Sequence, residues 1–207
     1  MGTELPIIFR GAGGDNRFNF DWFDYAAGAG YKTFYCCAGK NDSGAQYFLT
    51  TEQIASDNDN LSTGALGVGT VEVNFDVTFN NPVTIAAADC LIEFTGNANA
   101  ANDSGYVIAT IYHVNSAAVE TSLGTVQSAT ITSAGGASMQ RKSMKVALTK
   151  KAFGIGEKLR AEIQFVVSNA SVTFYYDPSS RTALTEGGTG ASIPSDIRIN
   201  VPFVVDL

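Results

Sequence analysis

The stretch "VEVNFDVTF", residues 71–79, decides the fold class because its apolar and polar residues alternate without a break. Apolar side chains fall at the odd positions and polar ones at the even positions, and this period of two is typical of a strand with one buried face. The segment "IRINVPFVVDL", residues 197–207, repeats the pattern, and its Pro202 indicates a sheet edge or a bulge. Both segments therefore predict half-buried β-strands.

Other strand-like segments fill most of the remaining chain, each bounded by Gly, Asn, Asp or Ser. They are residues 31–37, 46–50, 90–96, 105–114, 123–132, 142–149, 158–168 and 171–176. They do not alternate with long amphipathic helices, which disfavours a parallel sheet built from βαβ units. The sequence predicts an all-β protein folded as a two-sheet antiparallel sandwich of the jelly-roll type.

The domain organisation predicted from length and composition is one sandwich with an extended N-terminal arm. With 207 residues, 45% of them hydrophobic, the chain can bury a full core. We place the arm, rich in glycine and aromatic residues, at 1–29 and the sandwich at 30–207.

The aromatic residues of the arm are its most informative feature, because glycine-rich tails gain nothing by carrying them unless they are buried. Glycine permits unusual backbone paths, and aromatic rings supply large contact areas. We predict an assembly interface in the arm, although an arm that closes one end of its own sandwich fits the same composition. The candidate interface residues are Phe18, Phe20, Trp22, Phe23 and Tyr25.

Charge and hydropathy argue against nucleic-acid and membrane partners. The formal net charge of -7 disfavours phosphate backbones. The nearest approach to a basic cluster, Arg141, Lys142 and Lys145, is interpreted as a solvated face. No segment has the length of a membrane span, and the N-terminus lacks the pattern of a signal peptide.

Residues suited to catalysis or metal binding are few. His113 is the single histidine, and it lies in a strand-like run, which favours a structural role. Cys36, Cys37 and Cys90 lack the helix-start or glycine-elbow context that lowers a thiol pKa, and their spacing does not fit a zinc site. The sequence predicts no catalytic residue, no cofactor and no metal.

Three loop motifs have ordinary explanations. Residues 56–60, "SDNDN", lack the spacing of an EF-hand calcium loop, and residues 11–14, "GAGG", lack the lysine of a phosphate loop. The tetrapeptide "NDSG" occurs at 41–44 and at 102–105, where it predicts tight turns. Residues 178–196 form a long polar loop of the kind that often contacts a partner.

Several segments resemble small jelly-roll structural proteins of tailed-phage particles, of the capsid-decoration, head-fibre or tail-accessory kind. The residues that carry the resemblance lie at 30–57, 150–167, 174–181 and 196–207. The resemblance implies a virion protein without an active site. It also implies that copies associate, often as trimers, and bind another virion component such as the major capsid protein, after assembly in the host cytoplasm.

The sequence thus favours a non-enzymatic structural protein of a phage particle, and two alternatives stay open. The first is a carbohydrate- or receptor-binding sandwich, with Trp22, Tyr175 and Tyr176 as stacking residues and Tyr106 and Tyr112 less suited because their run resembles a core strand. The second is a hydrolase on the same fold. That alternative requires either two carboxylates converging in a cleft or His113 beside an acid and a nucleophile.

Overall fold

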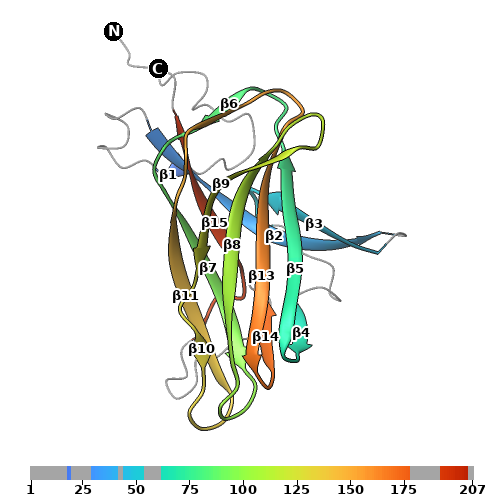
Figure 1. Ribbon diagram of the computed structural model, residues 1–207, viewed down its shortest axis with the longest axis vertical. Helices are drawn as coiled ribbons and strands as arrows, with labels where there is room; N and C mark the ends of the chain where they lie inside the picture. The colour runs from blue at the N-terminus through green and yellow to red at the C-terminus, as the bar shows by residue number, and fades with distance from the viewer. Residues whose placement is uncertain (1–17, 20–28, 42–43, 54–61, 178–191, 205–207) are drawn as a thin grey trace.

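The computed structural model describes residues 18–19, 29–41, 44–53, 62–177 and 192–204. This part of the chain is all-β, as predicted (Figure 1). The predicted arm at 1–29 lies almost entirely outside the described residues, so its extent stays a prediction.

Eight long strands form two antiparallel sheets that face each other, and together they make the predicted sandwich. In the order of their hydrogen-bonded neighbours, the strands of the front sheet are β9 (Glu120–Gln127), β8 (Ser104–Val114), β13 (Lys158–Asn169) and β5 (Gly69–Thr78). Those of the back sheet are β11 (Ser138–Ala147), β7 (Asp89–Ala98), β15 (Arg198–Val204) and β2 (Ala29–Asn41). The chain passes repeatedly between the two sheets, as in a jelly roll.

Shorter strands extend and connect these sheets. β3 (Gly44–Thr50) pairs with β2 and also forms a parallel bridge to β5, so it joins the sheets along one side. Along the other side β9 and β11 approach without pairing, and the backbone N–H of Thr149 donates to the carbonyl of Leu123 at 3.0 Å. The remaining strands are β1 (Phe18–Asn19), β4 (Ser62–Leu66), β6 (Val83–Ile85), β10 (Ile131–Thr132), β12 (Lys151–Phe153) and β14 (Val172–Tyr175).

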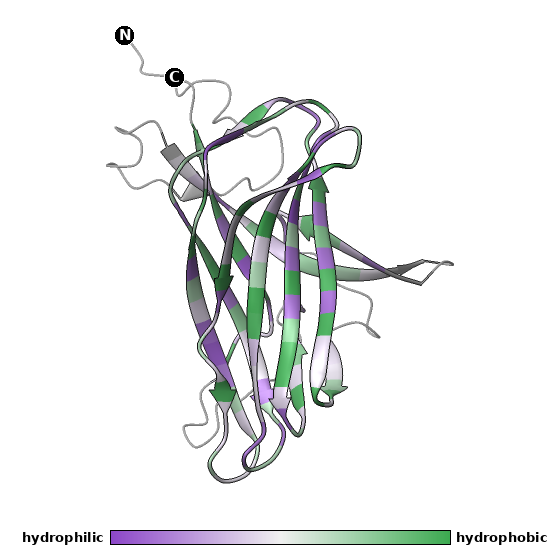
Figure 2. Cartoon of the chain, in the orientation of Figure 1, coloured by the Kyte–Doolittle hydropathy of each residue, from purple (hydrophilic) through white to green (hydrophobic). Residues whose placement is uncertain are grey.

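The core lies between the sheets and takes alternate residues from each strand, as the green and purple bands of Figure 2 indicate. On β13 the alternation is strict, with Leu159, Ala161, Ile163 and Phe165 buried. Burial of this apolar surface is the main favourable term in folding. The largest fully buried side chains include Phe34, Phe75, Phe94, Phe153, Phe165 and Phe174.

The position of β15 differs from the prediction made from Pro202. β15 is a central strand, paired with β2 on one side and β7 on the other. Proline is tolerated there because the pairing with β7 covers Arg198 to Asn200 and ends before Pro202. Pro202 still faces Tyr31 of β2, and its carbonyl accepts from Ala86 N at 3.0 Å.

Candidate functional site

Of the five aromatic residues in the predicted assembly interface, the structure describes Phe18. Phe18 belongs to β1, where its backbone pairs with Lys32 of β2. Phe20, Trp22, Phe23 and Tyr25 lie outside the described residues. The interface therefore stays a prediction.

His113 points into the sandwich near the end of β8, where it is 5% exposed. Its Nε2–H donates to Glu157 Oε2 at 2.8 Å, and its ring packs edge-on against Phe153. Glu157 Oε2 also accepts from Gly154 N at 2.7 Å. The bonds from His113 and Gly154 lower the pKa of Glu157 below its ordinary value of 4.5.

The other ring nitrogen of His113 has no hydrogen-bond partner among the described residues. A nucleophile activated by a histidine must lie within hydrogen-bond reach of that nitrogen. The described residues thus give His113 an acid but no nucleophile, and the pair closes one end of the sandwich by fixing the turn at 154–157.

The three cysteines are free thiols in the interior. Burial raises the pKa of Cys36 and raises that of Cys90 to about 12. Raised thiol pKa values disfavour the reactive thiolate. Among the described residues, no three His, Cys, Asp or Glu side chains gather into a group that could hold a metal ion.

The tyrosines do not lie where the sequence placed them. Tyr176 is 4% exposed, and its hydroxyl donates to the carbonyl of Ser62 at 2.8 Å, so it cannot stack on a sugar. Tyr175 is half-buried at the end of β14. Tyr106 and Tyr112, predicted as core, alternate with the buried residues of β8 and therefore lie on the outer face of the front sheet.

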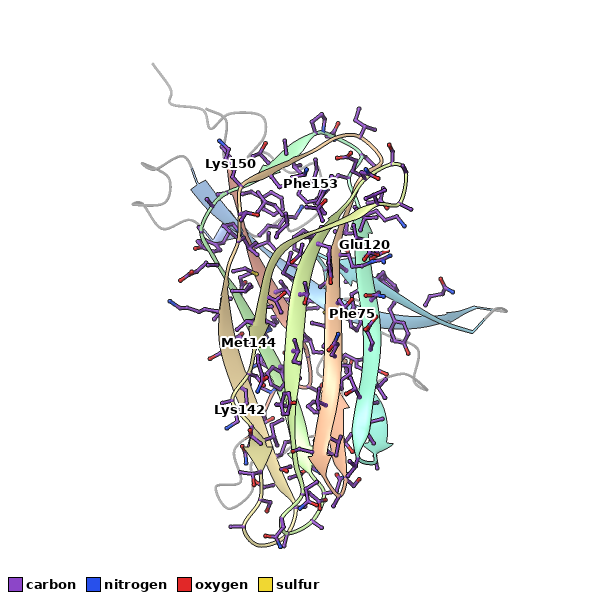
Figure 3. The ribbon with its side chains drawn as sticks, in the orientation of Figure 1. Phe75, Glu120, Lys142, Met144, Lys150 and Phe153 are labelled. Atoms are coloured by element: carbon purple, nitrogen blue, oxygen red, sulfur yellow. The ribbon has the colours of Figure 1, made fainter. Side chains whose placement is uncertain are left out.

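Around these two tyrosines the outer face of the front sheet carries a set of charged residues that we call the acidic face. No described strand covers it in Figure 1, and Glu120, labelled in Figure 3, lies toward one end of it. Its carboxylates outnumber its cations four to two, so the face is negative. The charged residues of the acidic face are Glu72, Asp76, Glu120, Lys158, Arg160 and Glu162.

One half of the acidic face is neutralised internally. Arg160 donates to both carboxylate oxygens of Asp76, at 2.7 and 2.8 Å, and also to Glu120. Lys158 Nζ lies 3.6 Å from Asp76. These contacts tie β13 to β5 and β9.

The other half contains two carboxylates that form no ion pair with a described residue. Glu72 and Glu162 both accept from Gln164 Nε2, at 3.4 and 3.0 Å, and neither forms an ion pair with a described residue. Burial raises the pKa of Glu162, and the charge of Glu72 adds to that rise. Beside them Asn74, opposite Glu162 in register, has a buried carbonyl oxygen without a donor among the described residues. A carboxyl with a raised pKa can hold a proton, but these residues lie on an open sheet face.

The outer face of the back sheet is built differently. Asp196 is fully buried, and its carboxylate accepts from Arg141 at 2.9 Å and from Arg198 at 2.5 Å. Arg141 also lies 3.3 Å from Glu93. The interpretation of Arg141 as part of a solvated face is therefore wrong, because it anchors the segment that enters β15.

Comparisons with known proteins bear on the fold. No protein-family model matches the chain, and no curated protein matches it. Two crystal structures of a CocE/NonD family hydrolase from Staphylococcus aureus match it with TM-scores of 0.53 and 0.51, at 12% and 11% identity. The matches cover 85% and 86% of this chain but 37% of the hydrolase chain in each case. At this identity the likeness shows a shared fold, found in part of a longer hydrolase.

These matches correct the predicted class of protein. The chain was predicted to be a non-enzymatic structural protein of a phage particle, with a carbohydrate- or receptor-binding sandwich as the alternative. The two solved structures named above are of a hydrolase, and they contradict both the functional prediction and the prediction that the protein is not an enzyme. The predicted self-association and the absence of nucleic-acid partners are not tested.

Proposed function

We propose that this chain is the β-sandwich part of a hydrolytic enzyme and works beside a catalytic part that supplies the reacting groups. The observation that carries the proposal is the match to a hydrolase over 85% of this chain and 37% of that enzyme. A fold by itself does not define an activity. The proposal therefore assigns the sandwich a place in an enzyme of this class and leaves the reaction to the catalytic part.

The geometry of the described residues supports this division. His113 is bound to Glu157, and no described residue places a nucleophile at its other nitrogen. The thiols are buried, and the carboxylate pair of Glu72 and Glu162 lies on an open sheet face. This carboxylate pair is not enclosed by a site that excludes water, whereas catalysis by charge stabilisation works best in such a site.

The experiment follows the untagged chain, detected by antibody, through three successive columns from an extract of its own source cells. Each fraction is assayed with p-nitrophenyl acetate for ester hydrolysis and with L-alanine p-nitroanilide for amide hydrolysis. We expect hydrolytic activity to elute with the chain through all three columns, and the recombinant chain alone to be inactive.

Two results would contradict this proposal. If no hydrolytic activity follows the chain, it does not belong to a hydrolase. If the recombinant chain alone hydrolyses either substrate, and Glu162→Gln abolishes that activity, the reacting groups lie in the sandwich itself and no separate catalytic part is needed.

A further inference from the structure

We propose, on the basis of the function proposed above, that the acidic face is the surface on which the catalytic part docks, and that the docking surface of that part is rich in Lys and Arg. The inference names the partner's chemistry and the side of the sandwich that it contacts. It rests on four observations. The outer surface of the front sheet is open, its charge is unbalanced, some of its polar groups lack hydrogen-bond partners, and half-buried aromatic side chains lie on it.

The acidic face is the open side of the sandwich. No described strand crosses the outer surface of β8, β13 and β5. On the back sheet, in contrast, the segment leading into β15 lies over the outer surface, where Thr95 is fully buried and donates to the carbonyl of Pro194 at 2.6 Å. The front sheet is therefore the more accessible of the two for a large partner.

The acidic face and the outer face of the back sheet also differ in how their charges are balanced. On the back sheet, the carboxylates of Glu93 and Asp196 are matched by the guanidinium groups of Arg141 and Arg198. On the acidic face, Glu72 and Glu162 form no ion pair with a described residue and share the amide of Gln164. The nearby charge of Arg160 acts on Glu162, but the guanidinium itself is bound to Asp76 and Glu120. Complementary charge fixes the orientation of partners and excludes wrong ones. Lys and Arg side chains on a partner would balance the negative charge of the acidic face.

The polar groups at the centre of the acidic face are already partly removed from water. Glu162 is half-buried, and Asn74 has a carbonyl oxygen that is buried and accepts no hydrogen bond from a described residue. A buried acceptor without a donor is unfavourable. An N–H donor from Lys or Arg that reaches Glu162 would give this carboxylate a charged hydrogen-bond partner.

Aromatic and aliphatic side chains give this face the apolar area that a stable contact needs. Tyr106, Ile108, Tyr112 and Val166 are half-buried on the outer side of β8 and β13. They lie among the polar groups described above. Tyrosine is enriched at the centre of protein interfaces, with polar residues around it.

The test compares two charge reversals on exposed strand residues. Glu72→Lys changes the acidic face, and Asp89→Lys makes the same change in net charge at the start of β7 on the back sheet. Circular dichroism and thermal melting establish that both variants fold. Each tagged chain is expressed in the source cells, and its complex is isolated and assayed as above.

We expect Glu72→Lys to weaken association with the hydrolytic activity by about tenfold or more, because like charges meet across the contact. We expect Asp89→Lys to leave it unchanged. If Glu72→Lys fails to fold, Glu162→Gln replaces it, with Asp89→Asn as its control.

A second readout uses labelling of carboxyl groups with a carbodiimide and glycine ethyl ester. In the complex, labelling of Glu72 and Glu162 should fall several-fold relative to the recombinant chain, while labelling of Asp89 stays constant. If hydrolytic activity associates equally with wild type and with Glu72→Lys, and labelling does not change, the docking proposal is wrong. The proposed function is unaffected by that result. Absence of activity from the wild-type complex overturns both. Protection of Glu72 and Glu162 in the recombinant chain at high concentration indicates a second copy as the occupant and also overturns the docking proposal.

Discussion

At the scale of single residues, the thiols show how burial controls chemistry in this protein. Cys36 and Cys90 are fully buried, and Cys37 is 1% exposed. Burial raises the pKa of Cys36, and the neighbouring Cys37 and Asp196 add to the rise. The sandwich thus holds Cys36 and Cys90 in their protonated, unreactive form.

We therefore expect the native protein to resist thiol reagents. With 5,5′-dithiobis(2-nitrobenzoic acid) at pH 8, the folded chain should release little chromophore over an hour. In guanidinium chloride the same sample should report all three thiols. A thiol that reacts within seconds in the native state would mean that the back sheet opens locally.

Glu162 gives a second prediction at this scale, because its folded pKa is raised above its ordinary value of 4.5. A carboxyl whose folded pKa is raised destabilises the protein above that pKa, and the effect disappears as the pH falls through the folded pKa toward 4.5. Removing a like-charge neighbour on a sheet is worth roughly 0.2–1 kcal/mol. Glu162→Gln should raise the free energy of unfolding by about this amount at pH 7 and by nothing at pH 4, as measured by urea denaturation. A variant less stable than wild type at pH 7 would contradict this account.

The sequence could predict which residues of a strand alternate but not which residues of different strands come together. In β5 the alternation identified Val73 and Phe75 as core. In β8 apolar residues occur on both faces, and polar residues do too, with Thr110 outward and His113 inward. The pattern therefore did not mark the outward side, and Tyr106 and Tyr112 were taken to lie in a core-like run. Tyr176 was misplaced because exposure of a tyrosine near a strand end depends on what packs above it.

The pairing of Glu72 with Glu162 could not be predicted for a related reason. Glu162 and Glu72 are 90 positions apart in the sequence, and they meet because the register of β13 and β5 places Gln164 opposite Glu72. Register depends on the whole sheet and not on local pattern. Asp196 was missed likewise, because nothing in its local sequence marks it as buried.

At the scale of elements, the connection into β15 depends on the buried carboxylate of Asp196. Its two arginine partners come from β11 and from β15 itself. The bond from Arg141 ties the start of β15 to the edge strand of the back sheet.

Asp196→Asn should lower the free energy of unfolding by about 3–5 kcal/mol, because it removes the buried negative charge that two arginines contact. Asp89→Asn is the matched control: Asp89 is half exposed and pairs with Lys145 at 3.5 Å, so its loss should cost less than about 1 kcal/mol. Chemical denaturation of both variants measures the difference. Equal costs would mean that the network around Asp196 contributes no more than a surface pair.

The close approach of β9 to β11 requires a glycine at position 124. A Cβ added there would lie 2.6 Å from the carbonyl oxygen of Ala147 and 2.7 Å from a methyl group of Val146. The first of these atoms is backbone and cannot move independently.

Gly124→Ala should therefore push the two sheets apart at this edge and destabilise the protein by about 1–3 kcal/mol, the usual cost of overpacking. Gly135→Ala, at a site with no atom near the added methyl group, is the control. Thermal melting compares the two. A melting temperature unchanged in Gly124→Ala would show that the edge yields without cost.

At the scale of the whole molecule, the fold depends on pairing between distant parts of the chain. β15 lies between β2 and β7, and Ile199 and Val201 enter the core from it, next to Ile197 just before the strand. Without β15, the back sheet has no strand between β2 and β7.

A chain that stops at residue 196 should therefore fail to fold. We expect no near-ultraviolet circular dichroism and no cooperative transition on heating. Ile199→Val in the complete chain is the control and should cost only about 0.5–1.5 kcal/mol. A sharp transition in the shortened chain would indicate that β2 and β7 can close the sheet without β15.

The same pairing has a consequence for synthesis. The hydroxyl of Thr33 on β2 donates to Asn200 on β15, a residue 167 positions later. At about 5–20 residues per second, a ribosome needs roughly 8–30 seconds to deliver that partner. During this interval β2 presents a free edge to every other nascent chain nearby. We therefore expect the yield of this protein in a cell to depend on how well β2 is shielded while translation continues, and not only on the stability of the finished sandwich.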